Sequence, residues 1–401
     1  MTCLSDLFEQ EPQQWGLRGD AYLWREMRAR LAQSPMPDGP SALGGMISIA
    51  FKDLTGRDLE TCDDFCVERF AHGGMSSGFV CAEFWRNEAV PQLRENWSDL
   101  KNRSKVPSGM ANEYILARQI NWAENRGLDL VGSKGDRGRL AYTRTLNQNL
   151  FEPLTPGVLA QFMAGDGGEI PLHPEPGIPG KMNAVHSSSA LGVNIFHYWN
   201  RLNLVSEIAA ACGLCQSGSA KQWVLRFEEK LKIAGIKSAR CPNIDVVIYD
   251  REENPTKLFA VECKFTEAYG GRQHPGLKQA YLDCEDLWPE IPALRSIAEE
   301  IAGEDQVYHH LHPAQLIKHV LGCRSKLAGT NGSFRLLYLW YDALGAAGAT
   351  HQAEIDRFSE ACKSDGVRFH ALSYQELIAN IAQRHRRQHP YYVKYITERY
   401  L

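Results

Sequence analysis

The hydrophobic and polar positions in the second half of the chain change repeatedly between a helical and a strand period. Apolar residues spaced three or four apart predict helices, and strict alternation of apolar and polar residues predicts strands. An order of helices and strands of this kind is typical of one sheet covered by helices. We therefore expect an α/β (α+β) domain with a mixed sheet flanked by helices. The predicted helices span 187–202, 221–235, parts of 275–325, 351–362 and 375–383, and the predicted strands span 243–250, 257–265, 335–342 and 367–374.

Polar and Pro/Gly-rich stretches divide the chain into three predicted segments. Residues 1–105 read as helices joined by Gly/Pro turns, which predicts a mainly helical accessory module. The stretch NWSDLKNRSKVPSG at 96–109 has few apolar residues and is the best boundary. Residues 106–185 are predicted to be a connecting region with one helix, at about 110–126, and short strands. Residues 186–401 form the predicted sheet domain, which ends in a basic, aromatic tail whose Arg and exposed Tyr side chains could contact nucleic acid or another subunit.

The charges of the chain are nearly balanced, because 44 Lys and Arg face 48 Asp and Glu, a formal net charge of −4. Nonspecific binding to phosphates requires a large excess of basic residues, so a polycationic packaging protein is excluded. An enzyme that combines a basic substrate surface with an acidic metal site is not excluded. No apolar stretch reaches the roughly 18 residues of a membrane span, the first residues do not resemble a signal peptide, and the 11 cysteines are scattered. We therefore expect a cytoplasmic protein without a membrane partner.

Three charged residues stand out within the two strands predicted at 243–250 and 257–265. Asp245 alternates with Ile244 and Val246, so it leaves the sheet on the face opposite these apolar residues. Glu262 and Lys264 are two residues apart and therefore share a face. If the two strands pair as a hairpin, Asp245 comes next to Glu262. Two carboxylates and one ammonium group would then converge in apolar surroundings.

Buried charges of this kind are unfavourable unless they are paired or bind a metal ion. A divalent ion with oxygen ligands would relieve the repulsion between the two carboxylates, and Mg²⁺ usually takes only one or two protein carboxylates. Lys264 could hold or deprotonate a nucleophilic water, or stabilise negative charge on a phosphoryl group. The residues thus indicate hydrolysis of a phosphodiester with Mg²⁺, which Mn²⁺ could replace. The plain alternative is an ordinary ion-paired sheet surface, where such pairs contribute only ~0.2–1 kcal/mol.

This segment resembles the PD-(D/E)XK nuclease superfamily, also called restriction-endonuclease-like. The resemblance rests on Pro242-Asn-Ile-Asp245, followed after sixteen residues by Glu262-Cys-Lys264, and on the element order of about 186–385. The chain departs from the family pattern because two residues separate Pro242 from Asp245. The resemblance implies a core of a helix, a β-meander, a helix and a further strand. It also implies that Asp245 and Glu262 bind the metal, that the carbonyl group of Cys263 joins them, and that Lys264 assists the attacking water.

The resemblance extends the predicted site to further residues. The family often adds an acid from the helix before the meander, and in a helix at 221–235 Glu228 would lie at the border of the apolar face. We therefore predict Glu228 as a third catalytic and metal-binding acid, with a surface salt bridge to Lys232 as the equally plain alternative. The region after the EXK strand often approaches the scissile phosphate in this superfamily. It predicts Lys278 and Gln279 as substrate-binding residues.

The function implied by this resemblance is a Mg²⁺-dependent endodeoxyribonuclease of restriction or phage-defence type. Its products would carry a 5′-phosphate and a 3′-hydroxyl, and cutting both strands would require two sites, so we expect a homodimer. A methyltransferase or another component of a defence system is the expected protein partner, beside DNA. Two alternatives stay open: a nuclease fold retained for binding DNA or protein in a larger complex, and a repair or recombination nuclease that acts on branched DNA.

Overall fold

The computed structural model describes residues 49, 111–135, 137–164, 168–171, 177–216, 223–236, 241–251, 253–270, 274–343 and 345–401. The predicted helical module at 1–105 lies outside the described residues, apart from Ile49. The chain divides into two compact units. The first contains the described residues up to Gly127 together with Asp342–Ala349 and Tyr374–Leu401, and the second contains Leu128–Tyr341 and Thr350–Ser373. The predicted boundaries at 105/106 and 185/186 stay predictions.

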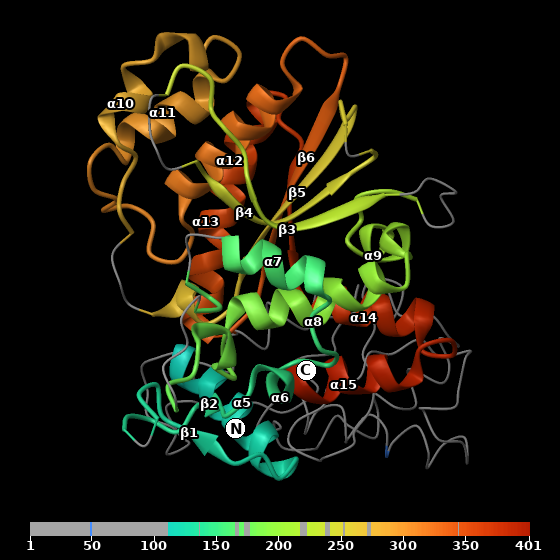
Figure 1. The fold of residues 1–401 in the computed structure, drawn as a ribbon. Coiled ribbons are helices and arrows are strands. Elements are labelled where there is room, and N and C mark those ends of the chain that lie inside the picture. Colours follow the sequence, from blue (N-terminus) through green and yellow to red (C-terminus); the bar gives the residue numbers. More distant parts are fainter. Residues whose placement is uncertain are drawn as a thin grey trace. The chain divides into compact units, whose positions relative to one another are not determined.

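A mixed five-stranded sheet forms the centre of the second unit (Figure 1). Its strand order is β3-β4-β5-β6-β7, and the pairs β3/β4 and β4/β5 are antiparallel, whereas β5/β6 and β6/β7 are parallel. Parallel neighbours need a long crossover connection, which the helices between β5 and β6 and between β6 and β7 provide. The strands are β3 (Val224–Lys230), β4 (Asn243–Tyr249), β5 (Lys257–Lys264), β6 (Ser333–Trp340) and β7 (Phe369–Ser373).

Helices cover both faces of this sheet (Figure 1). Helix α8 packs on β4 and β5, where its Gly192 lies against the sulfur atom of Cys263, whereas α12 packs on β5 and β6 and contacts Lys264 through Gln315. Since Cys263 and Lys264 point to opposite faces, α8 and α12 lie on opposite sides of the sheet. The helices of this unit are α6 (Leu146–Asn149), α7 (Pro156–Ala164), α8 (Ser188–Arg201), α9 (Val205–Ala211), α10 (Gln279–Leu282), α11 (Pro292–Glu300), α12 (Pro313–Leu327) and, from Thr350, α13 (Gly345–Ser364).

Most of the elements predicted in the second half of the chain are confirmed. The helix predicted at 187–202 is α8, and its start is capped because the Ser187 hydroxyl accepts a hydrogen bond from the Ala190 N–H group at 3.2 Å. One face of the 15-residue helix α12 packs into the large apolar core that also contains Leu258 and Leu336. The remaining short elements of this unit are β1 (Leu130–Val131), β2 (Tyr142–Thr143), and the 3-10 turns η5 (Lys181–Asn183), η6 (Glu267–Tyr269) and η7 (Glu285–Leu287).

The helix predicted at 221–235 is wrong, because the chain forms β3 there. Leu225 and Phe227 are buried and alternate with the partly exposed Arg226, which is a strand pattern. Glu, Lys and Leu are good helix formers, so local propensity favoured a helix. Pairing of the whole segment with β4 and packing of Phe227 against Phe162 of α7, with ring centroids 5.5 Å apart, outweigh that preference.

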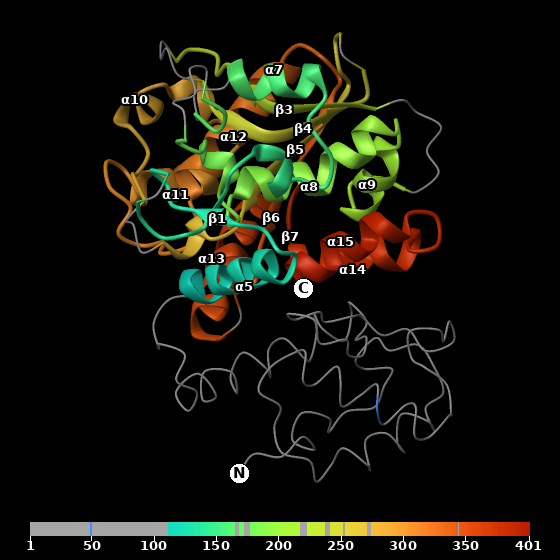
Figure 2. The ribbon, with the colours of Figure 1, turned by 60° about the horizontal axis from the view of Figure 1, so that its bottom comes forward.

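The first unit contains α5 (Ala111–Asn125), which the sequence predicted, with α14 (Tyr374–His385) and α15 (Pro390–Tyr400) (Figure 2). The C-terminal tail is a packed helix rather than an exposed segment. Only Tyr391 among its tyrosines is exposed, at 83%, whereas Arg399 is buried with its guanidinium group 4.1 Å from the centre of the Trp122 ring. The prediction of exposed tail tyrosines is therefore wrong for the others, because α15 is amphipathic and packs on α5. None of the described helices is long and apolar enough to cross a membrane.

Candidate active site

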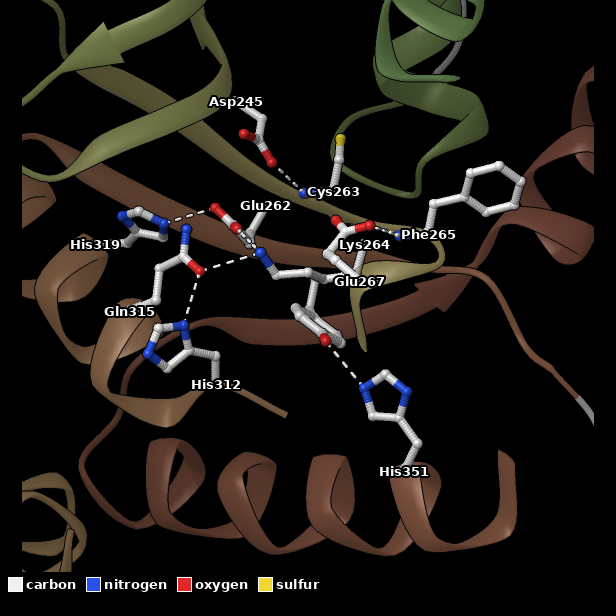
Figure 3. A network of polar contacts seen from close by, with 11 residues as sticks. Asp245, Glu262, Cys263, Lys264, Phe265, Glu267, His312, Gln315, His319 and His351 are labelled. Atoms are coloured by element: carbon white, nitrogen blue, oxygen red, sulfur yellow. Dashed lines mark hydrogen bonds and ion pairs between the residues drawn. The ribbon is translucent and has the colours of Figure 1, made fainter. Parts of the chain in front are cut away.

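Asp245, Glu262 and Lys264 come together on the paired strands β4 and β5 (Figure 3). The register pairs Val246 with Val261, which places Asp245 opposite Glu262 at the next position. The N–H group of Cys263 donates a hydrogen bond to Asp245 Oδ2 at 2.7 Å, and Lys264 Nζ donates to Glu262 Oε1 at 2.6 Å. The structure therefore brings the three predicted residues into one cluster at the end of this hairpin.

Two side chains of α12 complete this cluster, and sequence reasoning missed both. Lys264 Nζ donates to Gln315 Oε1 at 3.0 Å, and His319 Nε2 lies 2.7 Å from Glu262 Oε2 (Figure 3). A carboxylate oxygen only accepts hydrogen bonds, so His319 Nε2 carries a proton. Gln315 and His319 are four residues apart and therefore lie on one side of the helix. The available signal was this polar pair on a helix face that is otherwise apolar.

Burial and charge set the protonation of the hairpin residues. Burial opposes ionisation of Glu262, whose side chain is 1% exposed, but the charges of Lys264 and His319 outweigh it and lower its pKa to about 2. Burial also opposes the charged form of Lys264, yet Glu262, Glu267 and Asp245 raise its pKa above the ordinary value. The buried Glu262 and the partly exposed Lys264 therefore form an ion pair, with Glu262 also held by the neighbouring imidazole.

Asp245 is in the opposite situation, because burial and the negative charge of Glu262 raise its pKa well above the ordinary value. Only its Oδ2 atom has a hydrogen-bond partner among the described residues. Each carboxylate oxygen can accept more than one hydrogen bond, so Asp245 has room for another positively polarised partner. A partly buried acid with this surplus of negative charge around it is a suitable place for a cation.

Glu228 belongs to this acidic group, although the helical argument for it was wrong. It lies on β3 between the pairs Phe227–Val246 and Glu229–Ile244, and therefore opposite Asp245. Its backbone has a positive φ of 53°, which interrupts the regular pairing at this position. Burial and the charges of nearby acids raise its pKa to about 7, although Asn243 donates a hydrogen bond to its Oε2 atom. The described residues show no ion pair between Glu228 and Lys232, which was the alternative for a helix.

Glu169 is a further acid that the sequence did not reveal. Its charge raises the pKa of Glu228, second only to the effect of burial. Burial also raises the pKa of Glu169 itself, whereas a hydrogen bond with Ser189 at the start of α8 lowers it. Glu169 follows the Gly-rich run GDGG, which predicted a loop or a boundary, and no periodicity marks one loop residue as facing the sheet.

The donor atoms of this group fit a hard divalent ion. Asp245, Glu228 and Glu262 offer carboxylate oxygens, the donors that Mg²⁺ prefers, and Mg²⁺ needs only one or two of them because it keeps several waters. In the described part of the chain, no three His, Cys, Asp or Glu side chains are already arranged as a closed metal cage. The raised pKa values of Asp245 and Glu228 are the observation that favours a cation, since their negative charges lack compensation.

Comparison with known families agrees with this geometry. The family described as Restriction Endonuclease associating with ARP matches residues 92–401. The chain belongs to this family. It is therefore a member of the restriction-endonuclease-like, PD-(D/E)XK superfamily, and its mixed sheet with flanking helices is the core that the superfamily predicts. The chain has no match among the curated proteins, and none among the solved structures.

The two predicted substrate-binding residues of this restriction endonuclease family member occupy different positions. Lys278 lines a pocket of about 840 Å³ that Gln315 and His319 also line, so it lies beside the cluster. Gln279 begins α10, is exposed, and donates a hydrogen bond from Nε2 to Asp283 Oδ1 at 3.0 Å. It does not line that pocket.

Proposed function

We propose that this chain is a metal-dependent endodeoxyribonuclease that hydrolyses phosphodiester bonds of DNA. The observation that carries the proposal is the cluster of Asp245, Glu262 and Lys264 on one hairpin of a chain from a restriction endonuclease family. An ordinary ion-paired sheet surface would leave these groups in water. Here Glu262 is buried beneath α12 and pairs with both Lys264 and His319. A solvent-exposed ion pair would not need a second positively polarised partner, because water already solvates it.

Asp245 and Glu262 would hold a divalent ion, with Glu228 beside them and the backbone carbonyl group of Cys263 as a further oxygen donor. Mg²⁺ is the proposed ion, and Mn²⁺ could replace it. A divalent ion bound there would supply Lewis-acid activation of the attacking water and neutralise charge on the phosphoryl group. Glu262 keeps lone pairs for this role, because Lys264 occupies one lone pair of Oε1 and His319 occupies one lone pair of Oε2.

Lys264 has a different task in this proposal. Glu262 and Gln315 fix its Nζ atom through two hydrogen bonds, so the third N–H direction points away from both partners. An ammonium group held in this way orients a water or a phosphoryl oxygen and stabilises the negative charge that grows during attack. Water adds to phosphorus, the bond from phosphorus to the 3′-oxygen breaks, and the leaving oxygen takes up a proton. The products are a 5′-phosphate and a 3′-hydroxyl.

The biological role that we propose is restriction or defence against phage in the cytoplasm. The family description names association with ARP, and we propose that this chain shares that association. A homodimer would supply the two sites needed to cut both strands. A methyltransferase that protects the host's own DNA is the other proposed partner, because a cell that makes a restriction enzyme must shield its own sites.

Cleavage of plasmid DNA with Mg²⁺ tests the proposed function. We expect Lys264→Met to lose cleavage by two orders of magnitude or more, the effect of removing one stabilising donor from a transition state. Lys257→Met is the matched control, because Lys257 lies on the same strand and is exposed, and it should cleave like the wild type. Cleavage by Lys264→Met at the rate of Lys257→Met and of the wild type would refute the assigned site.

Parallel substrates separate the proposed function from its alternatives. Linear duplex, branched DNA, single-stranded DNA and RNA are incubated with the wild type and with Asp245→Asn. Cleavage confined to branched DNA would favour repair or recombination. Tight DNA binding without cleavage of any substrate, with Mg²⁺ or Mn²⁺, would favour a binding module and contradict the proposal.

A further inference from the structure

The pocket beside the active site has its own chemistry. It is bounded by the start of β4, the segment that leads into α10, and the N-terminal half of α12. Its volume of about 840 Å³ is typical of a site for a whole organic ligand, since ligand pockets measure roughly 300–1,000 Å³. Gln315 and His319 form part of its wall and at the same time bind Lys264 and Glu262 (Figure 3). A ligand in the pocket would therefore contact the two side chains that hold Lys264 and Glu262.

The charge of the pocket wall is positive. Lys278 and Lys318 line it, and none of its described lining residues is Asp or Glu. In the part of the chain that the structure describes, the ammonium groups of Lys278 and Lys318 have neither a hydrogen bond nor an ion pair. Lys318 is only partly exposed, and burial, together with the charges of Lys278 and Lys264, lowers its pKa, although Glu262 opposes this. An anion between the two lysines would compensate both charges.

The rest of the wall suits an organic group attached to that anion. Ile236, Pro242, Leu277 and Tyr281 present apolar surface, and Asn243 adds an amide. The wall at Leu277 is fixed, since its N–H group donates to the Ile301 carbonyl at 3.0 Å and its own carbonyl accepts from the Gly303 N–H group at 3.0 Å. The pocket thus has a fixed wall that combines apolar surface with the two lysines. A phosphate ion alone would leave most of this volume unused.

We propose that this pocket binds one nucleotide of the cleaved DNA strand, with its phosphate group between Lys278 and Lys318 and its nucleoside against the apolar wall. The inference rests on the proposed function and specifies the conformation in which the DNA substrate is bound. A base inside a duplex is stacked and paired and cannot enter such a pocket, so the nucleotide must leave the stack. The enzyme therefore binds DNA with one nucleotide turned out beside the scissile phosphate.

Calorimetric titration of the full chain with deoxynucleoside 5′-monophosphates, in EDTA, tests the pocket without requiring cleavage. We expect binding that is tighter than that of inorganic phosphate. Lys278→Gln and Lys318→Gln should each weaken it by about tenfold or more, because each removes a charge-assisted hydrogen bond. Lys326→Gln is the matched control, since Lys326 lies on the same helix, is exposed and does not line the pocket. Phosphate binding as tight as nucleotide binding, or equal affinity of all three variants, would overturn the inference.

A second titration identifies the source of the nucleotide. A duplex that carries 2-aminopurine at successive positions around a mapped cleavage point is bound in EDTA, and unstacking of one base raises its fluorescence. We expect a rise at one position in the wild type and a loss of that rise in Lys318→Gln. Monophosphate binding without any fluorescence rise would assign the pocket to a free nucleotide and overturn the inference. Because the first titration involves no cleavage, its failure is distinct from failure of the proposed nuclease activity.

Discussion

Removal of the imidazole of His319 tests how far the active site depends on α12. The contact between His319 Nε2 and Glu262 Oε2 is 2.7 Å long, and both side chains are 1% exposed. Water cannot replace the lost partner easily at this depth. A hydrogen bond to a charged group contributes about 1.5–3 kcal/mol, so His319→Ala should lower the free energy of unfolding by at least this amount.

The same substitution should affect cleavage through the position of Glu262. Without His319, Glu262 keeps only Lys264 as a partner among the residues that the structure describes, so its Oε2 atom is free to turn away from the place where it is proposed to act. We expect kcat to fall by about tenfold to a hundredfold, which corresponds to about 1.4–2.7 kcal/mol, while KM changes little, because His319 would act through Glu262 and not on the substrate. His319→Gln retains an N–H donor of similar reach and should recover most of kcat.

Urea unfolding and steady-state cleavage kinetics measure the two effects. His309→Ala serves as the control, because the His309 side chain is exposed, and both quantities should match the wild type. If His319→Ala loses stability but keeps its kcat, the imidazole only supports packing, and the assigned role as a positioning residue is refuted. If His319→Gln is as inactive as His319→Ala, hydrogen bonding to Glu262 is not what the imidazole supplies.

Two further outcomes follow from the pocket wall. Burial, together with the facing charges of His274, Lys264 and Lys318, lowers the pKa of His312 from 6.5 to about 4, so the folded protein favours neutral His312. The contribution of neutral His312 to stability is fully present above pH 6.5 and is lost as the pH falls towards 4. Urea unfolding at several pH values should therefore show that the unfolding free energy of His312→Gln falls less steeply with acidification than that of the wild type. An equally steep fall in both proteins would contradict this. A methyl group at Gly276 would lie 2.0 Å from a backbone carbonyl oxygen of the facing segment, so Gly276→Ala should lower the unfolding free energy by about 1–3 kcal/mol; unchanged thermal stability would contradict that geometry.

The hairpin was predictable because its signals are local. Alternation in the segment NIDVVIYD assigns Asp245 to one face, and the spacing of Glu262 and Lys264 assigns both to one face of the next strand. The register then brings the two strands together as that pattern predicts. The overall class of the fold followed from the same periodicities and was confirmed.

The parts that sequence reasoning missed depend on contacts between distant segments. β3 has a helix-forming composition, and its pairing with β4 together with packing of Phe227 on α7 makes it a strand. His319 is 57 positions from Glu262, so nothing local to either residue indicates their contact. Glu169 lies in a loop, where no period predicts the direction of a side chain. Glu228 was selected because it would border the apolar face of a helix that does not exist. It belongs to the acidic group because β3 pairs with β4.

The assigned active site requires that Asp245 and Glu262 bind a divalent ion, and this binding can be measured without DNA. Mn²⁺ is titrated into the protein in the absence of DNA, and free Mn²⁺ is followed by electron paramagnetic resonance. We expect saturable binding to the wild type that is at least tenfold weaker in Asp245→Asn and in Glu262→Gln. Glu253 is an exposed acid in the connection between the same strands, so Glu253→Gln should leave the affinity unchanged. Affinities for Mn²⁺ that are equal in all four proteins would contradict the assigned active site.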